Sequence, residues 1–146
     1  MQTLNLEANR LSGTLPSELG DLSNLQTLNL ENNSLSGTFP SELNLNNLKT
    51  YNLENPPYVE TEIDDVDAIL GANFSLNVSG NFGDINNNIE RYSASGLPEG
   101  LIINSTKGEI SGTPTKKGNS TVTVTATDQA GSQVKMNLIL RYRLPI

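Results

Sequence analysis

The sequence predicts a mainly β protein in two parts. Residues 1–56 are expected to form a short solenoid of parallel strands with little helix, and residues 57–146 a β-sandwich. The first part is indicated by a stretch that begins at Met1 and returns at Leu25, a period of 24 residues. The second is indicated by a change, after two consecutive prolines at 56–57, to short runs of Val, Ile, Thr and Tyr separated by Gly, Asn and Pro.

The internal repeat runs without gaps over two full copies. Residues 1–20 read MQTLNLEANRLSGTLPSELG, and residues 25–44 read LQTLNLENNSLSGTFPSELN. A third copy begins at Leu48 and stops after LKTYNLEN. The pattern L-x-x-L-x-L-x-x-N at a period of roughly 20–29 residues is typical of leucine-rich repeats. Stacked repeats present extended binding surfaces, so the pattern favours a binding function over chemistry.

The motif N-x-L-S-G-x-x-P, at residues 9–16 and 33–40, resembles the plant-type subclass of leucine-rich repeats. The resemblance covers the whole of the first part and implies a leucine-rich-repeat solenoid. Asn9 and Asn33 are expected to form a structural ladder, with their side-chain amides turned inward and bonded to the backbone of neighbouring turns. In the third copy the same position falls on Pro56, so the solenoid is predicted to end there.

Leucines alternate with polar residues in each copy, which predicts strands with one buried face. The residues expected in this core include Leu4, Leu28, Tyr51, Leu6, Leu30, Leu53, Leu11 and Leu35. The polar residues between them then line an exposed face. Because the copies are in register, that face is predicted to carry four columns of like residues. The columns are Gln2/Gln26/Lys49, Thr3/Thr27/Thr50, Asn5/Asn29/Asn52 and Glu7/Glu31/Glu54.

The second part is predicted to hold short strands joined by turns. The expected strands are Tyr58–Val66, Asn73–Val78, Ile89–Ser95, Leu101–Ile103, Glu109–Ser111, Ser120–Thr127 and Gln133–Arg141. The last two have the clearest period of two, with Val122, Val124 and Ala126 on one face of the first. The loop Asp128-Gln-Ala-Gly131-Ser is predicted to join them as a hairpin.

Three ordered motifs in this part carry a second resemblance. They are YSASGLPEGL at residues 92–101, GEISGTP at 108–114 and VTVTATD at 122–128. These motifs resemble the Ig-like and dystroglycan-type cadherin-like modules of microbial surface proteins. The resemblance implies an Ig/cadherin-like β-sandwich that acts as a spacer or adhesion unit, and some members of the family bind calcium. With little more than two full repeats before it, this part is expected to cap the C-terminal end of the solenoid.

Composition excludes several function classes. The chain has 146 residues, 9 Lys and Arg against 16 Asp and Glu, a net charge of −7, and neither His nor Cys. No basic stripe is present for nucleic acid, so no nucleic-acid partner is expected. No apolar run is long enough to span a membrane, so no transmembrane segment is expected. Without histidine or a phosphate-binding glycine loop, the protein is not expected to be an enzyme.

One oxygen-rich constellation could bind a metal. The loop Asp84-Ile-Asn86-Asn-Asn88 lies where the resembled family carries an aspartate-rich loop, and Asp128 lies at its Ala-Thr-Asp position. The resemblance therefore implies a calcium site with Asp84, Asn86, Asn88 and Asp128 as ligands, since calcium prefers oxygen donors. The alternative is an asparagine-rich turn whose side chains bond to the backbone.

The four columns on the exposed face are the candidate ligand site. Three of them are identical down the stack, which suits a scaffold or a repetitive ligand such as a glycan or an extended peptide. We therefore predict an extracellular or cell-surface module for adhesion to a protein, peptide or glycan. One alternative is a calcium-stiffened spacer without its own ligand, and the other is an accessory module of a secreted glycan-degrading enzyme. The lack of an N-terminal cap before Met1 suggests a fragment of a larger surface protein.

Overall fold

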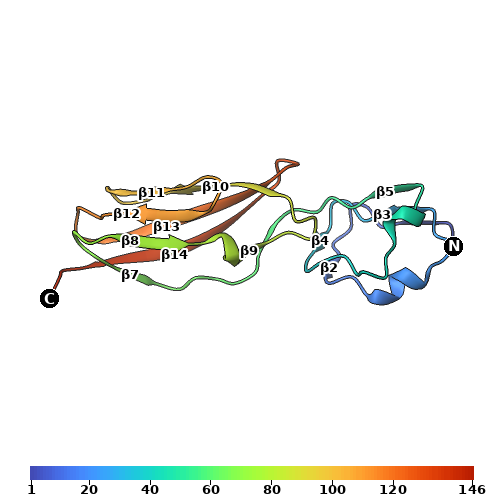
Figure 1. The fold of residues 1–146 in the computed structure, drawn as a ribbon, viewed down its shortest axis with the longest axis horizontal. Coiled ribbons are helices and arrows are strands. Elements are labelled where there is room, and N and C mark those ends of the chain that lie inside the picture. Colours follow the sequence, from blue (N-terminus) through green and yellow to red (C-terminus); the bar gives the residue numbers. More distant parts are fainter. The chain divides into compact units, whose positions relative to one another are not determined.

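The computed structural model describes residues 1–146 and is mainly β, as predicted (Figure 1). Fourteen strands and three short 3-10 helices are present, and there is no α-helix. The chain divides into two compact units. Unit 1 consists of Met1–Tyr58 together with Gly83–Asn88, and unit 2 consists of Val59–Phe82 together with Ile89–Ile146. Each unit is described by itself below.

Unit 1 is built on three parallel strands in the order β1-β3-β5. Thr3 lies opposite Thr27, and Thr27 lies opposite Thr50, so the repeated residues are aligned in register. A second, two-stranded parallel pair joins β2 to β4. The elements of this unit are β1 (Thr3–Asn5), β2 (Ser12–Gly13), η1 (Ser17–Asp21), β3 (Thr27–Asn29), β4 (Ser34–Leu35), η2 (Leu45–Asn47) and β5 (Thr50–Asn52).

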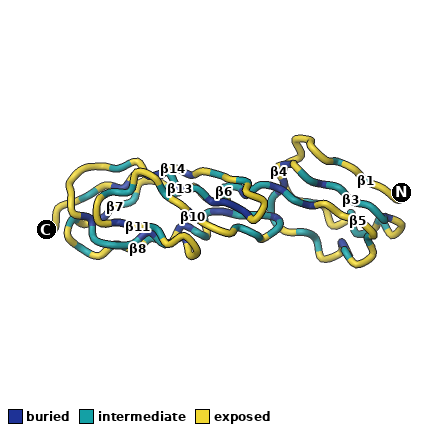
Figure 2. Tube along the Cα trace, turned by 90° about the horizontal axis from the view of Figure 1, so that it is seen from above, coloured by how far each residue is buried: buried dark blue, intermediate teal, exposed yellow.

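The core of unit 1 is centred on the middle copy of the repeat (Figure 2). Leu28 and Leu30 are fully buried, whereas Leu4, at the corresponding position of the first copy, is only half-buried. Two residues predicted in the core are instead exposed, Leu11 by 38% and Tyr51 by 52%. Tyr51 lies on β5, which is an edge strand of its sheet. Leu11 belongs to the first copy, whose strands β1 and β2 are also edge strands. Both residues therefore have a neighbouring copy on one side only.

Unit 2 contains two sheets, of orders β10-β13-β14-β7 and β11-β12-β8. Their strands pair antiparallel, except that β7 runs parallel to β14. Two further short strands, β6 and β9, pair where the chain passes between units. The elements are β6 (Tyr58–Val59), β7 (Val66–Ile69), β8 (Phe74–Asn77), η3 (Ser79–Asn81), β9 (Phe82–Gly83), β10 (Ile89–Ser95), β11 (Leu101–Ile103), β12 (Glu109–Gly112), β13 (Asn119–Asp128) and β14 (Gln133–Arg143).

The single strand predicted over Tyr58–Val66 is wrong. The structure has two strands there, β6 ending at Val59 and β7 beginning at Val66. The two pair with different partners, β6 with β9 and β7 with β14, so the backbone cannot continue as one ladder between them.

The core of unit 2 lies between the inward faces of the two sheets. Val122, Val124 and Ala126 on β13 are fully inaccessible, and so is Ile110 on β12, which confirms the predicted period of two. Phe82 and Tyr92 also belong to this core, with their ring centroids 6.0 Å apart. Burial raises the pKa of the Tyr92 hydroxyl above its ordinary value of 10.0.

The hairpin between β13 and β14 forms where it was predicted. The Gly131 N–H donates to the Asp128 carbonyl at 3.1 Å, and the Asp128 N–H donates to the Ser132 carbonyl at 3.0 Å. Gly131 has a φ of +88°, which completes a three-residue loop of the type-I-turn-plus-bulge class. None of the helices in this structure has the length and apolar character needed to cross a membrane.

Candidate functional site

The exposed side of β1, β3 and β5, which we call the strand face, is the candidate binding site. The strand register places Asn5 beside Asn29 and Asn29 beside Asn52, so the predicted asparagine and threonine columns are aligned. The column of Gln2, Gln26 and Lys49 lies just before the strands, where the Gln26 N–H donates to the Gln2 carbonyl and the Lys49 N–H to the Gln26 carbonyl, each at 2.8 Å.

Asparagines and glutamates of the strand face bond to each other across the strands. The Asn29 side-chain amide donates to the Glu7 carboxylate at 2.9 Å, and the Asn52 amide donates to Glu31 in the same way. Within the first copy, the Asn5 amide oxygen accepts from the Glu7 N–H at 3.0 Å. The amide groups are thus engaged within the protein, and the glutamate carboxylates form an acidic row that keeps further acceptor capacity for a ligand.

A second set of asparagines binds the backbone inside unit 1. Asn33 is buried, and its amide donates to the carbonyls of Leu6 at 2.9 Å and Leu30 at 3.0 Å, while its oxygen accepts from the Leu11 N–H at 3.1 Å. Asn9, in the first copy, is exposed and donates only to carbonyls of its own copy, those of Leu6 and Glu7.

The third ladder position is Asn55, not Pro56 as the repeat alignment predicted. Asn55 is 1% exposed, and its amide donates to the carbonyls of Leu30 and Leu53, both at 3.0 Å. Its oxygen accepts from the Asn33 N–H at 3.2 Å. Asn55 therefore links the third copy to the second, as Asn33 links the second copy to the first.

The four predicted calcium ligands are divided between the two units. Asp84, Asn86 and Asn88 belong to unit 1, and Asp128 belongs to unit 2. The Asn86 amide donates to the Leu53 carbonyl at 2.9 Å. No group of three or more Asp, Glu, His or Cys side chains lies close enough together to hold a metal ion.

Asp128 has an unusual environment for a carboxylate. It is fully buried at the end of β13, and one carboxylate oxygen accepts from the Ser132 N–H at 2.8 Å. The other oxygen is buried without a hydrogen-bond partner. A buried carboxylate oxygen without a hydrogen-bond partner is costly, so a further donor or a cation at Asp128 would stabilise the folded state.

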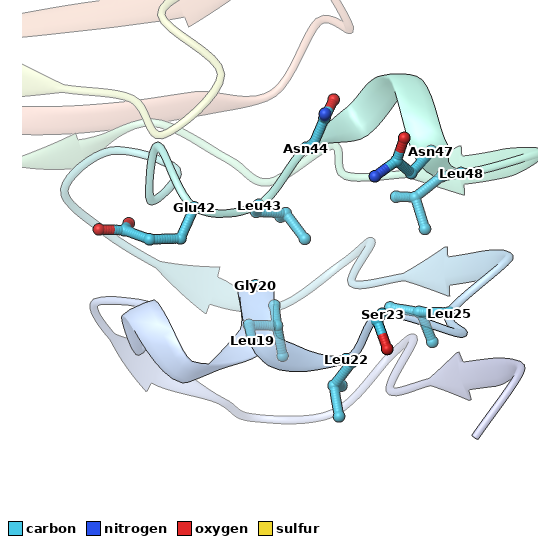
Figure 3. Close-up of a pocket in the computed structure, with 10 residues that line it drawn as sticks. All are labelled: Leu19, Gly20, Leu22, Ser23, Leu25, Glu42, Leu43, Asn44, Asn47 and Leu48. Atoms are coloured by element: carbon cyan, nitrogen blue, oxygen red, sulfur yellow. The ribbon is translucent and has the colours of Figure 1, made fainter.

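One cavity opens between consecutive copies of the repeat, on the side of η1 and η2 (Figure 3). Its volume is about 70 Å³, which accommodates a few water molecules but not a sugar ring. It is lined by Leu19, Gly20, Leu22, Ser23, Leu25, Glu42, Leu43, Asn44, Asn47 and Leu48. A methyl group at Gly20 would lie 2.5 Å from the Glu42 carbonyl, so this glycine permits the copies to approach closely. The cavity is a packing gap and carries no functional assignment.

Unit 2, with a core between two sheets, belongs to the class of β-sandwich proteins. Residues 56–142 match the family described as "Putative Ig domain", which is more than half of the chain, and the chain therefore belongs to this family. Residues 1–22 and 24–48 match the Leucine Rich Repeat family model. Neither match singles out the plant-type or the dystroglycan-type subclass.

Among curated proteins, the chain is similar to the "Serine-rich adhesin for platelets" of Staphylococcus aureus strain MRSA252. The two are 44% identical over 50 residues, which is 34% of this chain and 4% of the adhesin. The chain thus spans only a small part of the relative that it matches.

Among solved structures, the chain is similar to a "putative alpha-galactosidase" of Bacteroides fragilis NCTC 9343. The identity is 28% and the TM-score 0.52, over 62% of this chain and 18% of the other. A second alpha-galactosidase/melibiase structure from the same organism matches with 21% identity, a TM-score of 0.52 and the same two coverages. The second likeness, at this identity, concerns the fold alone.

Proposed function

We propose that the chain is a non-catalytic adhesion module of a cell-surface or secreted protein. In this proposal unit 1 is a short leucine-rich-repeat solenoid whose strand face binds a protein, peptide or glycan. The Ig-like sandwich serves as a spacer. The observation that carries the proposal is the acidic row of Glu7, Glu31 and Glu54, which repeats once per strand beside a column of asparagines.

The chemistry of the strand face limits its ligand. Neighbouring strands lie about 4.8 Å apart, so the carboxylates form a regular array of acceptors. A ligand that matches them has repeated donors, such as the basic side chains of an extended peptide or the hydroxyl groups of a glycan. The similarity to a staphylococcal adhesin supports a role in adhesion, and the similarity to an alpha-galactosidase structure supports the alternative of an accessory module of a glycan-degrading enzyme.

Charge reversal at Glu31 is expected to weaken binding to the ligand. Glu31 lies in the middle strand's copy, so Glu31→Lys places a cation at the centre of the acidic row. The wild-type chain and the variant would be applied to arrays of basic peptides and of glycans, including galactosides. We expect the wild-type chain to be retained on one of the two arrays. The substitution should lower its affinity for that array at least about tenfold, which corresponds to about 1.4 kcal/mol of binding free energy.

Glu18→Lys provides the matched control, because Glu18 is exposed on η1, away from the strands. It makes the same change of charge and is expected to leave retention unchanged. If both variants bind as the wild type does, or if neither array retains the wild type, the strand face is not the binding site. Selective retention of galactosides would favour the accessory role.

A second candidate function, a calcium-stiffened spacer, is favoured by the unpartnered carboxylate oxygen of Asp128. Calcium takes oxygen ligands, including carboxylates, amide carbonyls and water. Asp128 in unit 2 and the loop Asp84–Asn88 in unit 1 are proposed as separate candidates, each tested alone.

Calcium at millimolar concentration is expected to raise the thermal midpoint by several degrees, because a ligand that binds only the folded state stabilises it. Thermal unfolding would be recorded with calcium, with magnesium and with chelator. Asp128→Ala should remove the calcium shift if the metal lies in unit 2, and Asp84→Ala should remove it if the metal lies in unit 1. Coincident curves in all three conditions would rule out the calcium-stiffened spacer.

A further inference from the structure

The segment Gly83–Asn88 lies inside the stretch of sequence that matches the Ig family, but it packs with the repeats. It is part of unit 1, whereas the residues on either side of it in the sequence belong to unit 2. Ile85 is 4% exposed and belongs to the same apolar cluster as Leu30 and Leu53. An isoleucine from outside the repeats therefore occupies a place in the leucine core.

Asn86, which is half-buried, continues the asparagine ladder of Asn33 and Asn55. Its amide oxygen accepts from the Asn55 N–H at 3.0 Å, as the Asn55 oxygen accepts from the Asn33 N–H. Its amide nitrogen donates to the Leu53 carbonyl at 2.9 Å, as the Asn55 amide donates to Leu30 in the preceding copy. Asn86 thus makes, toward the third copy, two of the three bonds that Asn55 makes toward the second.

The loop also reaches the end of the acidic row. The Asn88 side-chain amide lies between two carboxylates, and in one orientation it donates to both oxygens of Glu54 at 3.3 Å. In the other orientation it donates to Asp84. The first arrangement corresponds to the bond from Asn52 to Glu31 one strand earlier.

A local turn holds the segment in position. The Asp84 carboxylate accepts from the Asn86 N–H at 2.7 Å, and the Asp84 carbonyl accepts from the Asn87 N–H at 2.9 Å. Asn87 has a φ of +53°, a conformation that asparagine tolerates better than most residues. This Asp turn places Asn86 and Ile85 without requiring a strand of their own.

We infer that residues Asp84–Asn88 are the terminal rung of the repeat stack, a tethered cap that takes the place of a fourth repeat. Repeats bury their core only against their neighbours, so the last one needs a partner. Here the partner is a six-residue segment, Gly83–Asn88, supplied from beyond the repeats in the sequence. The folding of unit 1 depends on it, whether or not the strand face binds a ligand.

Amide hydrogen exchange of the full chain tests this inference with two adjacent substitutions. Asn86→Asp replaces the donor to Leu53 with an acceptor, whereas Asn87→Asp makes the same change at an exposed residue and keeps a side chain that tolerates positive φ. With Asn86→Asp we expect exchange in residues 27–35 to accelerate at least about tenfold, with no change in residues 119–128. With Asn87→Asp neither segment should change.

A third variant makes the test independent of the ladder bond. Replacement of residues 84–88 by an equally long Gly-Ser segment removes Ile85 as well as Asn86. It should accelerate amide hydrogen exchange in residues 27–35 more than Asn86→Asp does. If residues 27–35 stay protected in this variant, or if Asn86→Asp and Asn87→Asp have equal effects, the segment is not a cap. Equal loss of protection in residues 27–35 and 119–128 would also overturn the inference, because it would show no preference for the repeats.

Discussion

Asn55→Asp is expected to destabilise unit 1 by about 3–5 kcal/mol, the usual cost of a buried charge that lacks compensation. The substitution keeps the size of the side chain and its acceptor oxygen. It removes the two N–H donors that now reach the carbonyls of Leu30 and Leu53. A carboxylate oxygen would then face two carbonyl oxygens at a position that is 1% exposed. Denaturant unfolding, followed by hydrogen exchange in residues 27–35, would measure the loss.

Asn32→Asp is the matched control for this prediction. Asn32 is exposed, and its φ of +57° is tolerated by aspartate as well as by asparagine. We expect a change within about 0.5 kcal/mol, as for most surface substitutions. If Asn55→Asp is no worse than this control, the buried ladder does not stabilise the repeats, and the role inferred for Asn86 loses its basis.

The repeat period was enough to predict the strand face but not the third ladder residue. A 24-residue period aligns Thr3 with Thr27 whatever the rest of the fold does. In the first two copies, a residue with positive φ, Ala8 or Asn32, precedes the ladder asparagine. The third copy lacks this residue, so its asparagine comes one position earlier, at Asn55, and an alignment by sequence falls on Pro56 instead.

The role of the loop Asp84–Asn88 could not be predicted from the sequence, for a different reason. A side-chain oxygen of asparagine or aspartate can bind a calcium ion, accept a hydrogen bond within a turn, or accept one from a neighbouring backbone N–H. The sequence alone does not distinguish these roles. Only the tertiary contacts with Leu53 and Asn55 show that Asn86 faces the repeats. By contrast, the alternation in β13 is local, and the buried face that it predicts, with Val122 and Val124, is the one observed.

The GEISGTP motif of residues 108–114, which carried part of the resemblance to Ig-like modules, is explained by packing in unit 2. Ile110 is fully buried in the core, and Gly112 ends β12 opposite Leu101. Gly112 has a φ of +134°, and a methyl group there would lie 1.9 Å from the Gly100 carbonyl oxygen. That oxygen accepts from the Thr113 N–H at 3.0 Å, so moving it aside would strain or break this hydrogen bond.

Gly112→Ala is therefore expected to cost about 3–5 kcal/mol, among the largest effects of a single substitution. Backbone strain alone accounts for about 1–3 kcal/mol at such a φ. Gly118→Ala measures the cost of backbone strain alone, because Gly118 has a φ of +119° and open space where its methyl group would lie. Denaturant unfolding of both variants would give the difference, and equal losses would mean that the close approach of the Gly100 carbonyl contributes nothing. A larger loss at Gly112 would show that the close approach of the Gly100 carbonyl makes glycine necessary at this motif position for the fold of the sandwich.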